Sequence, residues 1–228
     1  MRLTQAGLCE GYGGLSLAVT EVLGAELVWY SEIDPAARAL LARHHPTLPN
    51  VGDLTVADWS DVQPVDVLTG GWPCQPWSLA GQRKGAADER AIWPHIARAV
   101  RALRPRLVFL ENVASIAPAG ELARAAGDLA ALGYVGSWRR VRASDVGAPH
   151  QRARIFILAW ARDVGMDAEA GAVDARLRMV GGSVRGRGLH HSSARLPQAE
   201  GATWGVDDRR GRDSAVLEHD WSWSAERA

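Results

Sequence analysis

The sequence predicts an α/β fold built on a doubly wound, mostly parallel sheet with helices on both faces. Short apolar runs, each bounded by glycine, proline or charged residues, are typical of strands that are buried on both faces. Helix-like segments lie between those runs, and this alternation favours parallel strands joined by helical crossovers. The apolar runs span residues 25–30, 65–69, 107–110 and 155–159, and a weaker strand precedes residue 7.

The expected helices are bounded by residues that commonly start or stop helices. Asp34 is the expected N-cap of the second helix, and Pro35 takes its first position, where a missing N–H is tolerated. Pro105 should end the third helix, and Gly133 should close the fourth. The predicted helices span residues 15–23, 35–44, 92–103 and 121–132.

The composition is that of an ordinary globular protein, with 47% hydrophobic and 23% charged residues among 228. The formal net charge is zero, so the chain lacks the strong overall positive charge of many nucleic-acid-binding proteins. A zero net charge does not exclude a basic face on one side of the protein. Two cysteines are too few for a disulfide framework, which favours a reducing compartment. We find neither a signal peptide nor an apolar membrane span, and therefore expect a cytoplasmic protein with no membrane partner.

The character of the sequence changes after residue 162. Residues 163–228 contain nine glycines, nine arginines and eleven acidic residues, without an apolar run of the strand type. Such a segment buries too little apolar surface to offset the entropy lost on ordering it. We therefore expect a folded domain over residues 1–162 and a short, largely irregular C-terminal extension over residues 163–228.

A glycine-rich turn and two acidic residues form the first group with chemical meaning. Gly11-Tyr12-Gly13-Gly14 opens a helix, where a ligand could approach the backbone and free N–H groups; a simple closing turn is the alternative. Glu32 follows the next strand, at a position that suits the hydroxyls of a ribose. Asp53 could contact the amino group of a purine, or be only a turn residue.

A second group gathers around Cys74. This cysteine lies between Pro73 and Pro76, directly after a strand, which favours a positioned nucleophile over a packing role. Glu111 follows the next strand and should lie at the same edge of the sheet. Arg152 and Arg154 would point to one side of an extended segment and suit a phosphate or a carbonyl, although a solvated edge is as good an interpretation.

Taken in order, the segments GYGG, SEID, GD, GGWPCQPWS, ENV and QRAR resemble the DNA cytosine-5 methyltransferases. The resemblance implies a Rossmann-like domain that binds S-adenosyl-L-methionine, with a target-recognition region and a G-N-S-V-like closing segment after it. Residues 1–162 would then be the catalytic and cofactor-binding domain. Residues 163–228 would be a truncated or remnant target-recognition region, because Gly181-Gly182-Ser183-Val184 is only a faint echo of the closing segment.

The resemblance also implies a role for each matching residue. Cys74 would attack carbon 6 of cytosine, and Glu111 would bond ring nitrogen 3 and the exocyclic amine. Arg154 would hold the base carbonyl oxygen, and Arg152 would support the nucleophile and a nearby phosphate. No metal is implied. The implied cofactor-binding residues are Cys9, Gly11, Tyr12, Gly13, Gly14, Glu32, Ile33, Asp53, Leu54 and Pro73.

The function that follows is transfer of a methyl group from S-adenosyl-L-methionine to carbon 5 of a flipped cytosine in double-stranded DNA, through a covalent cysteine adduct. One alternative is a catalytically impaired remnant that only binds the cofactor or DNA. Another is a nicotinamide-dependent oxidoreductase, which the missing G-x-G-x-x-G spacing disfavours. We expect a bacterial or phage-encoded monomer, either part of a restriction-modification system or solitary, or a chain completed by a partner that supplies the closing segment.

Overall fold

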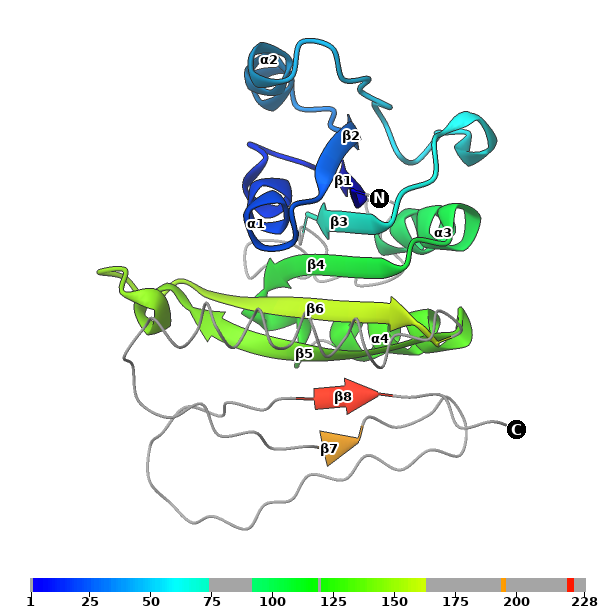
Figure 1. The fold of residues 1–228 in the computed structure, drawn as a ribbon. Helices are drawn as coiled ribbons and strands as arrows, with labels where there is room; N and C mark the ends of the chain where they lie inside the picture. Colours follow the sequence, from blue (N-terminus) through cyan, green and yellow to red (C-terminus); the bar gives the residue numbers. More distant parts are fainter. Residues whose placement is uncertain (1, 74–91, 119, 163–193, 196–220, 224–228) are drawn as a thin grey trace, which may run out of the picture.

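The computed structural model describes residues 2–73, 92–118, 120–162, 194–195 and 221–223, and they are organised around one sheet (Figure 1). Its strand order is β2-β1-β3-β4-β6-β5-β8-β7. The strand β1 pairs in parallel with β2 and with β3, and β3 pairs in parallel with β4. This confirms the predicted doubly wound, mixed α/β class. The strands are Thr4–Leu8 (β1), Glu26–Ser31 (β2), Val67–Gly71 (β3), Leu107–Val113 (β4), Tyr134–Arg142 (β5), Ala153–Ala161 (β6), Ala194–Arg195 (β7) and Trp221–Trp223 (β8).

Helices cover both faces of this sheet, and α1 and α3 lie on opposite sides of it in Figure 1. Val19 of α1 packs in a small cluster with Val67, whereas the neighbouring Leu68 faces the main core, which α3 and α4 cover. Adjacent strand residues point to opposite faces, so β3 is buried on both sides. The helices are Gly14–Leu23 (α1), Pro35–His44 (α2), Trp93–Leu103 (α3) and Glu121–Ala131 (α4).

The predicted helix boundaries hold in detail. The side chain of Asp34 accepts a hydrogen bond from the backbone N–H of Ala37 at 2.9 Å, as an N-cap should. Pro35 occupies the first turn of α2. Gly133 follows α4 with a φ of +88°, the left-handed conformation that glycine adopts without strain.

The strand order creates a switch point at the parallel edge of the sheet. From β1 the chain crosses to β2 on one side, and it then returns to β3 on the other side of β1. Doubly wound sheets bind ligands outside the carboxyl ends of the strands at such a switch point, so a ligand site is expected here. The residues at these ends are Leu8, Ser31, Gly71 and Val113.

The strand β5, which the sequence reading did not predict, forms an antiparallel hairpin-like pair with β6. Its sequence YVGSWRRVR lacks a continuous apolar run, but its buried residues alternate: Tyr134, Gly136 and Trp138 face inward. The alternation of buried and less buried residues that is typical of a strand was therefore present in the sequence. It was difficult to recognise because three arginines interrupt the apolar residues. Because β6 also pairs antiparallel with β4, the sheet is parallel from β2 to β4 and antiparallel from β4 through β6 to β5.

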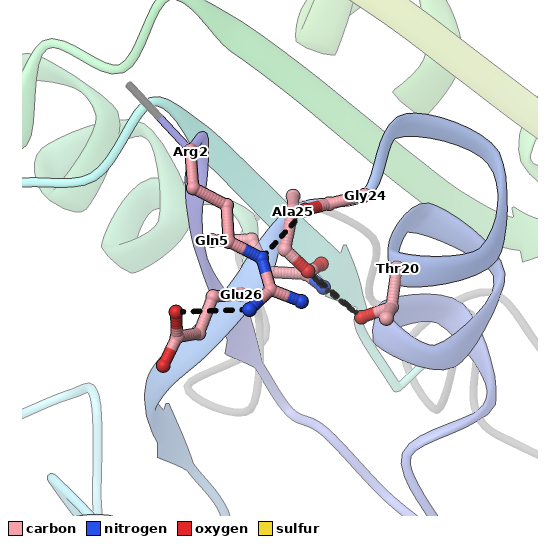
Figure 2. Close-up of polar contacts among 6 residues, drawn as sticks. All are labelled: Arg2, Gln5, Thr20, Gly24, Ala25 and Glu26. Atoms are coloured by element: carbon pink, nitrogen blue, oxygen red, sulfur yellow. Dashed lines mark hydrogen bonds and ion pairs between the residues drawn. The ribbon is translucent and has the colours of Figure 1, made fainter.

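The start of β1 is tied to the C-terminal end of α1 by polar contacts (Figure 2). The buried Gln5 side chain donates from Nε2 to Thr20 Oγ1 at 2.6 Å and to the Ala25 carbonyl at 3.1 Å. Arg2 donates to the Gly24 carbonyl and pairs with Glu26 at 3.6 Å. These contacts fix the α1–β2 connection, and thereby the angle at which α1 approaches the switch point.

The described parts of the C-terminal region extend the sheet. β8 pairs antiparallel with β5, and β7 pairs parallel with β8. The predicted irregular extension thus contributes two short strands, whereas the rest of residues 163–228 lies outside the described residues. Within the described chain, no helix has the length and apolar character that crossing a membrane requires.

Candidate active site

The glycine-rich turn lies at the carboxyl end of β1 and leads into α1. Gly11 and Gly13 have φ values of +58° and +84°, which L-residues with a side chain rarely adopt. A Cβ added at Gly11 or Gly14 would meet nothing within 4 Å, so the outer face of the turn is open. No side chain caps the first turn of α1. The turn therefore offers open backbone and a helix N-terminus at the switch point.

Glu32 braces this turn from the end of β2. Its Oε2 accepts from the Gly11 N–H at 2.6 Å, and its Oε1 accepts from the N–H groups of Ile33 and Asp34 at 2.8 and 2.7 Å. A carboxylate offers about four lone-pair positions, so these three bonds leave about one for a ligand hydroxyl. The structure thus gives Glu32 a positioning role that sequence reasoning missed, beside its predicted role toward a ribose.

Asn50 connects Glu32 to the turn that carries Asp53. Its Oδ1 accepts from the N–H groups of Glu32 and Gly52 at 3.1 and 2.9 Å, while its Nδ2 donates to the Glu32 carbonyl. Sequence analysis overlooked Asn50; its signal was an amide side chain two residues before Gly52, which has a φ of +78°. Asp53 is exposed, and the Thr55 backbone N–H lowers the pKa of its carboxyl.

Two titratable side chains of the turn itself are largely enclosed. Burial, and then the nearby Glu32, Asp53 and Glu10, raise the pKa of the Cys9 thiol to about 12, so this thiol is neutral at ordinary pH. Cys9 also has a φ of +50°. Burial raises the pKa of Glu10 to about 7, against a hydrogen bond from Ser16 that lowers it.

The remaining predicted cofactor residues differ in exposure. Tyr12 and Ile33 are 72% and 62% exposed, so both side chains are accessible to a ligand. Pro73 is exposed after β3. Leu54 instead has its side chain in the main core, which leaves only its backbone for a ligand.

Glu111 and Arg154 meet at the carboxyl end of β4. The Nε of Arg154 lies 2.7 Å from Oε1 of Glu111. Gly71 lies opposite Glu111 in the register of β3 and β4, and a Cβ at Gly71 would lie 3.4 Å from Oε2 of Glu111. The neighbouring Asn112 donates from Nδ2 to the Trp72 carbonyl at 3.2 Å, which anchors the start of the loop that follows β3.

The other two predicted catalytic residues are Arg152 and Cys74. Arg152 precedes β6, and its side chain is exposed. Its carbonyl accepts from Ala143 at 3.0 Å, so its backbone is held while its guanidinium faces solvent. Cys74 lies outside the described residues, which end at Pro73 on this side of the gap. The position of Cys74 relative to Glu111 therefore stays a prediction.

A family model described as C-5 cytosine-specific DNA methylase matches residues 3–198 of the chain. The chain belongs to this family. The match includes the glycine turn, the Glu32 and Asp53 segments, and the Glu111–Arg154 pair. The family assignment thus agrees with the resemblance that the ordered motifs indicated.

The curated relatives of this chain include proteins named type II methyltransferases. Type II methyltransferase M.NgoMIV of Neisseria gonorrhoeae is 33% identical over 163 residues, which cover 70% of this chain and 52% of the relative. Type II methyltransferase M.HhaI of Haemophilus parahaemolyticus is 32% identical over 163 residues, which cover 70% and 49%. The chain thus spans about half the length of these two relatives.

Solved structures share the fold. A protein of an Escherichia coli prophage, assigned as a DNA modification methyltransferase, gives a TM-score of 0.58 at 26% identity, with 71% of this chain and 47% of that chain covered. The Schizosaccharomyces pombe Dnmt2 methyltransferase gives 0.59 at 24% identity, with 72% and 52% covered, a likeness that shows the fold alone.

S-adenosyl-L-methionine, the cofactor that the resemblance implies, fits the chemistry of the residues at this switch point. The free lone pair of Glu32 can accept a ribose hydroxyl, and the charged Asp53 can accept from an exocyclic amine. The open outer face at Gly11 and Gly14 leaves room for a chain of atoms against the backbone. These assignments stay predictions.

Proposed function

We propose that this chain carries the methyl-transfer site of a DNA cytosine-5 methyltransferase, with residues 1–162 as its catalytic and cofactor-binding domain. The observation that carries the proposal is the Glu111–Arg154 pair, packed over Gly71 at the edge where the Cys74 loop begins, in a chain of the C-5 cytosine-specific family. Residues 163–228 would belong to the target-recognition region, and double-stranded DNA would be the partner.

Glu111 and Arg154 supply complementary hydrogen bonds to one edge of a cytosine. The guanidinium of Arg154 donates only, so it suits the base carbonyl oxygen. A protonated Glu111 would donate to ring nitrogen 3 and accept from the exocyclic amine. Protonation of nitrogen 3 withdraws electrons from the ring and makes carbon 6 electrophilic. A base can reach such an edge only after it leaves the DNA stack.

Cys74 would then act as the nucleophile. Its thiolate bonds to carbon 6, and carbon 5 becomes electron-rich enough to take a methyl group. When bound, S-adenosyl-L-methionine would supply this methyl group from its sulfonium and leave as the neutral thioether S-adenosylhomocysteine. Loss of the carbon 5 proton then expels the thiolate and restores the ring. Glu32, Asp53 and the glycine turn would hold the cofactor, and exposed Arg152 would contact a phosphate beside the flipped base.

The proposal is tested with DNA that carries 5-fluorocytosine, because fluorine at carbon 5 blocks the final loss of a proton. The chain should form a covalent adduct that depends on S-adenosyl-L-methionine, and Cys74→Ser should abolish it. Cys9→Ser is the matched control and should still form the adduct. Adduct formation through Cys9 would contradict the assignment, and binding of cofactor without any methyl transfer would favour the binding-only alternative.

A further inference from the structure

Glu10 is a buried carboxyl that the proposed mechanism does not use. It follows Cys9 directly in the glycine turn, and only 8% of its surface is exposed. Its Oε1 is enclosed and has no hydrogen-bond partner in the described part of the molecule. A buried polar atom without a partner is costly, so its presence beneath a ligand-binding turn requires an explanation.

The surrounding backbone is shaped to hold this carboxyl. A Cβ added at Gly7 would overlap Oε2 of Glu10, so residue 7 must be glycine while Glu10 lies there. On the other side, Oε1 lies 3.7 Å from the Cβ position of Gly13. The outer face of the same turn is open at Gly11 and Gly14. A ligand on that face would be separated from the Glu10 carboxyl by little more than the backbone.

The described groups that face Glu10 include no cation. Glu32, from the end of β2, is acidic and raises the pKa of Glu10, and Cys9 of the same turn is a neutral thiol. α1 contributes the Ser16 hydroxyl, which lies 3.1 Å from the Thr69 hydroxyl of β3. Among the ion pairs of the described residues, none involves Glu10. The site is therefore acidic and lacks a counter-ion of its own.

We propose that Glu10 selects for a cationic ligand at the glycine turn, and so favours S-adenosylmethionine over its neutral product S-adenosylhomocysteine. This inference rests on the proposed function for the identity of the ligand. S-adenosylmethionine carries a sulfonium, an ammonium and a carboxylate, whereas the product has lost the sulfonium charge. Glu10 is enclosed, so it acts through its electric field, which is weakly screened in a partly buried site.

Glu32 does not serve this purpose equally well. Three backbone N–H groups already compensate its charge, whereas Glu10 has a hydrogen bond from one hydroxyl. With a pKa of about 7, Glu10 is about half protonated at neutral pH in the free protein. A bound cation favours the ionised form, so binding must release a proton, and selectivity for the cation must rise with pH.

The test measures the dissociation constants of both ligands between pH 5.5 and 7.5 by calorimetry on the full chain. If a bound cation lowers the pKa of Glu10 by about one unit, the preference for S-adenosylmethionine should rise roughly sixfold over this range. Glu10→Gln should make the preference nearly independent of pH. Glu21→Gln removes an equal charge from the exposed side of α1 and should behave as the wild type.

Buffers of different ionisation heat give a second readout. At pH 7, S-adenosylmethionine should release roughly 0.4 of a proton from the wild type and none from Glu10→Gln. Uncharged 5′-methylthioadenosine should bind both proteins equally, with no proton release. Binding of these ligands with selectivity that is the same in wild type and Glu10→Gln would overturn this inference alone. Failure of the wild type to bind any adenosyl ligand would overturn the proposed function as well.

Discussion

Arg154 reaches diagonally across the antiparallel pair β4–β6 to bind Glu111, with 2.7 Å between Nε and Oε1. In the register of these strands Arg154 lies opposite Val113, two residues beyond Glu111. The two side chains are 22% and 27% exposed, so solvent screens the pair and it adds little to stability. The pair holds both side chains beside each other near the carboxyl end of β4.

Glu111→Gln should therefore reduce the rate of methyl transfer strongly while it changes the free energy of unfolding little. We expect the free energy of unfolding to change by less than about 1 kcal/mol, because the ion pair is partly exposed. Methyl transfer should slow by at least about 10²-fold, because glutamine cannot donate a proton to ring nitrogen 3. Urea denaturation and single-turnover incorporation of labelled methyl groups measure the two effects. A loss of stability that accounts for the loss of activity would contradict the catalytic role.

Gly7→Ala should destabilise the protein by roughly 1–3 kcal/mol, since the new Cβ would overlap the Glu10 carboxyl. Removing that carboxyl should relieve the clash. In a double-mutant cycle, Gly7→Ala should therefore cost much less in a Glu10→Ala background than in the wild type. Chemical denaturation of the four proteins gives the coupling free energy, and additive effects would show that the two positions do not compete for one space.

Gly13→Ala should cost about 1–2 kcal/mol, because a φ of +84° is strained for any residue with a Cβ. Gly14→Ala is the matched control: Gly14 begins α1, its added Cβ meets nothing within 4 Å, and alanine favours helix. Its free energy of unfolding should stay equal or rise. Equal losses in both variants would show that the turn is not held in this conformation.

The ligand-free protein should lose stability as pH rises because of Glu10. Its pKa is raised from 4.5 to about 7 by burial, so the folded state binds a proton more tightly than the unfolded chain. This contribution is complete below pH 4.5 and is lost as pH rises through about 7. Glu10→Gln should therefore be more stable than the wild type at pH 8, by on the order of 2 kcal/mol, and the gain should shrink toward pH 4.5. Thermal denaturation across this pH range measures the difference.

Cys9 should resist alkylation while the protein is folded. Burial raises the pKa of its thiol to about 12, and only the thiolate reacts quickly. In Cys74→Ser, where Cys9 is the remaining cysteine, iodoacetamide at pH 8.5 should label the folded protein at least about tenfold more slowly than the denatured one. Rapid labelling of the folded form would show that Cys9 is open to solvent and carries a thiolate.

Local patterns were enough to predict most of the framework. The capping of α2 by Asp34 and the buried runs at β3 and β4 depend on neighbours in sequence, and the structure confirms them. The strand β5 was not predicted, because its arginines interrupt the apolar pattern that is typical of a strand buried on both faces. Its pairing with β6, and hence the antiparallel part of the sheet, depends on contacts between residues distant in sequence.

The sequence by itself determined the type and order of the functional residues, because glycines at a turn, an acid after a strand and a cysteine between prolines each have local chemical reasons to occur. The tertiary structure decided what those residues touch. Glu32 accepts one hydrogen bond from Gly11 of the turn and two from the backbone that follows Glu32, Glu111 is paired with Arg154, and Glu10 fills the space left by Gly7. The contacts of Glu32 with Gly11 and of Glu111 with Arg154 are not visible in the sequence, because each joins segments whose distance is set only when the strands align in one sheet. The contact of Glu10 with Gly7 is local, but it depends on how the backbone folds at the turn.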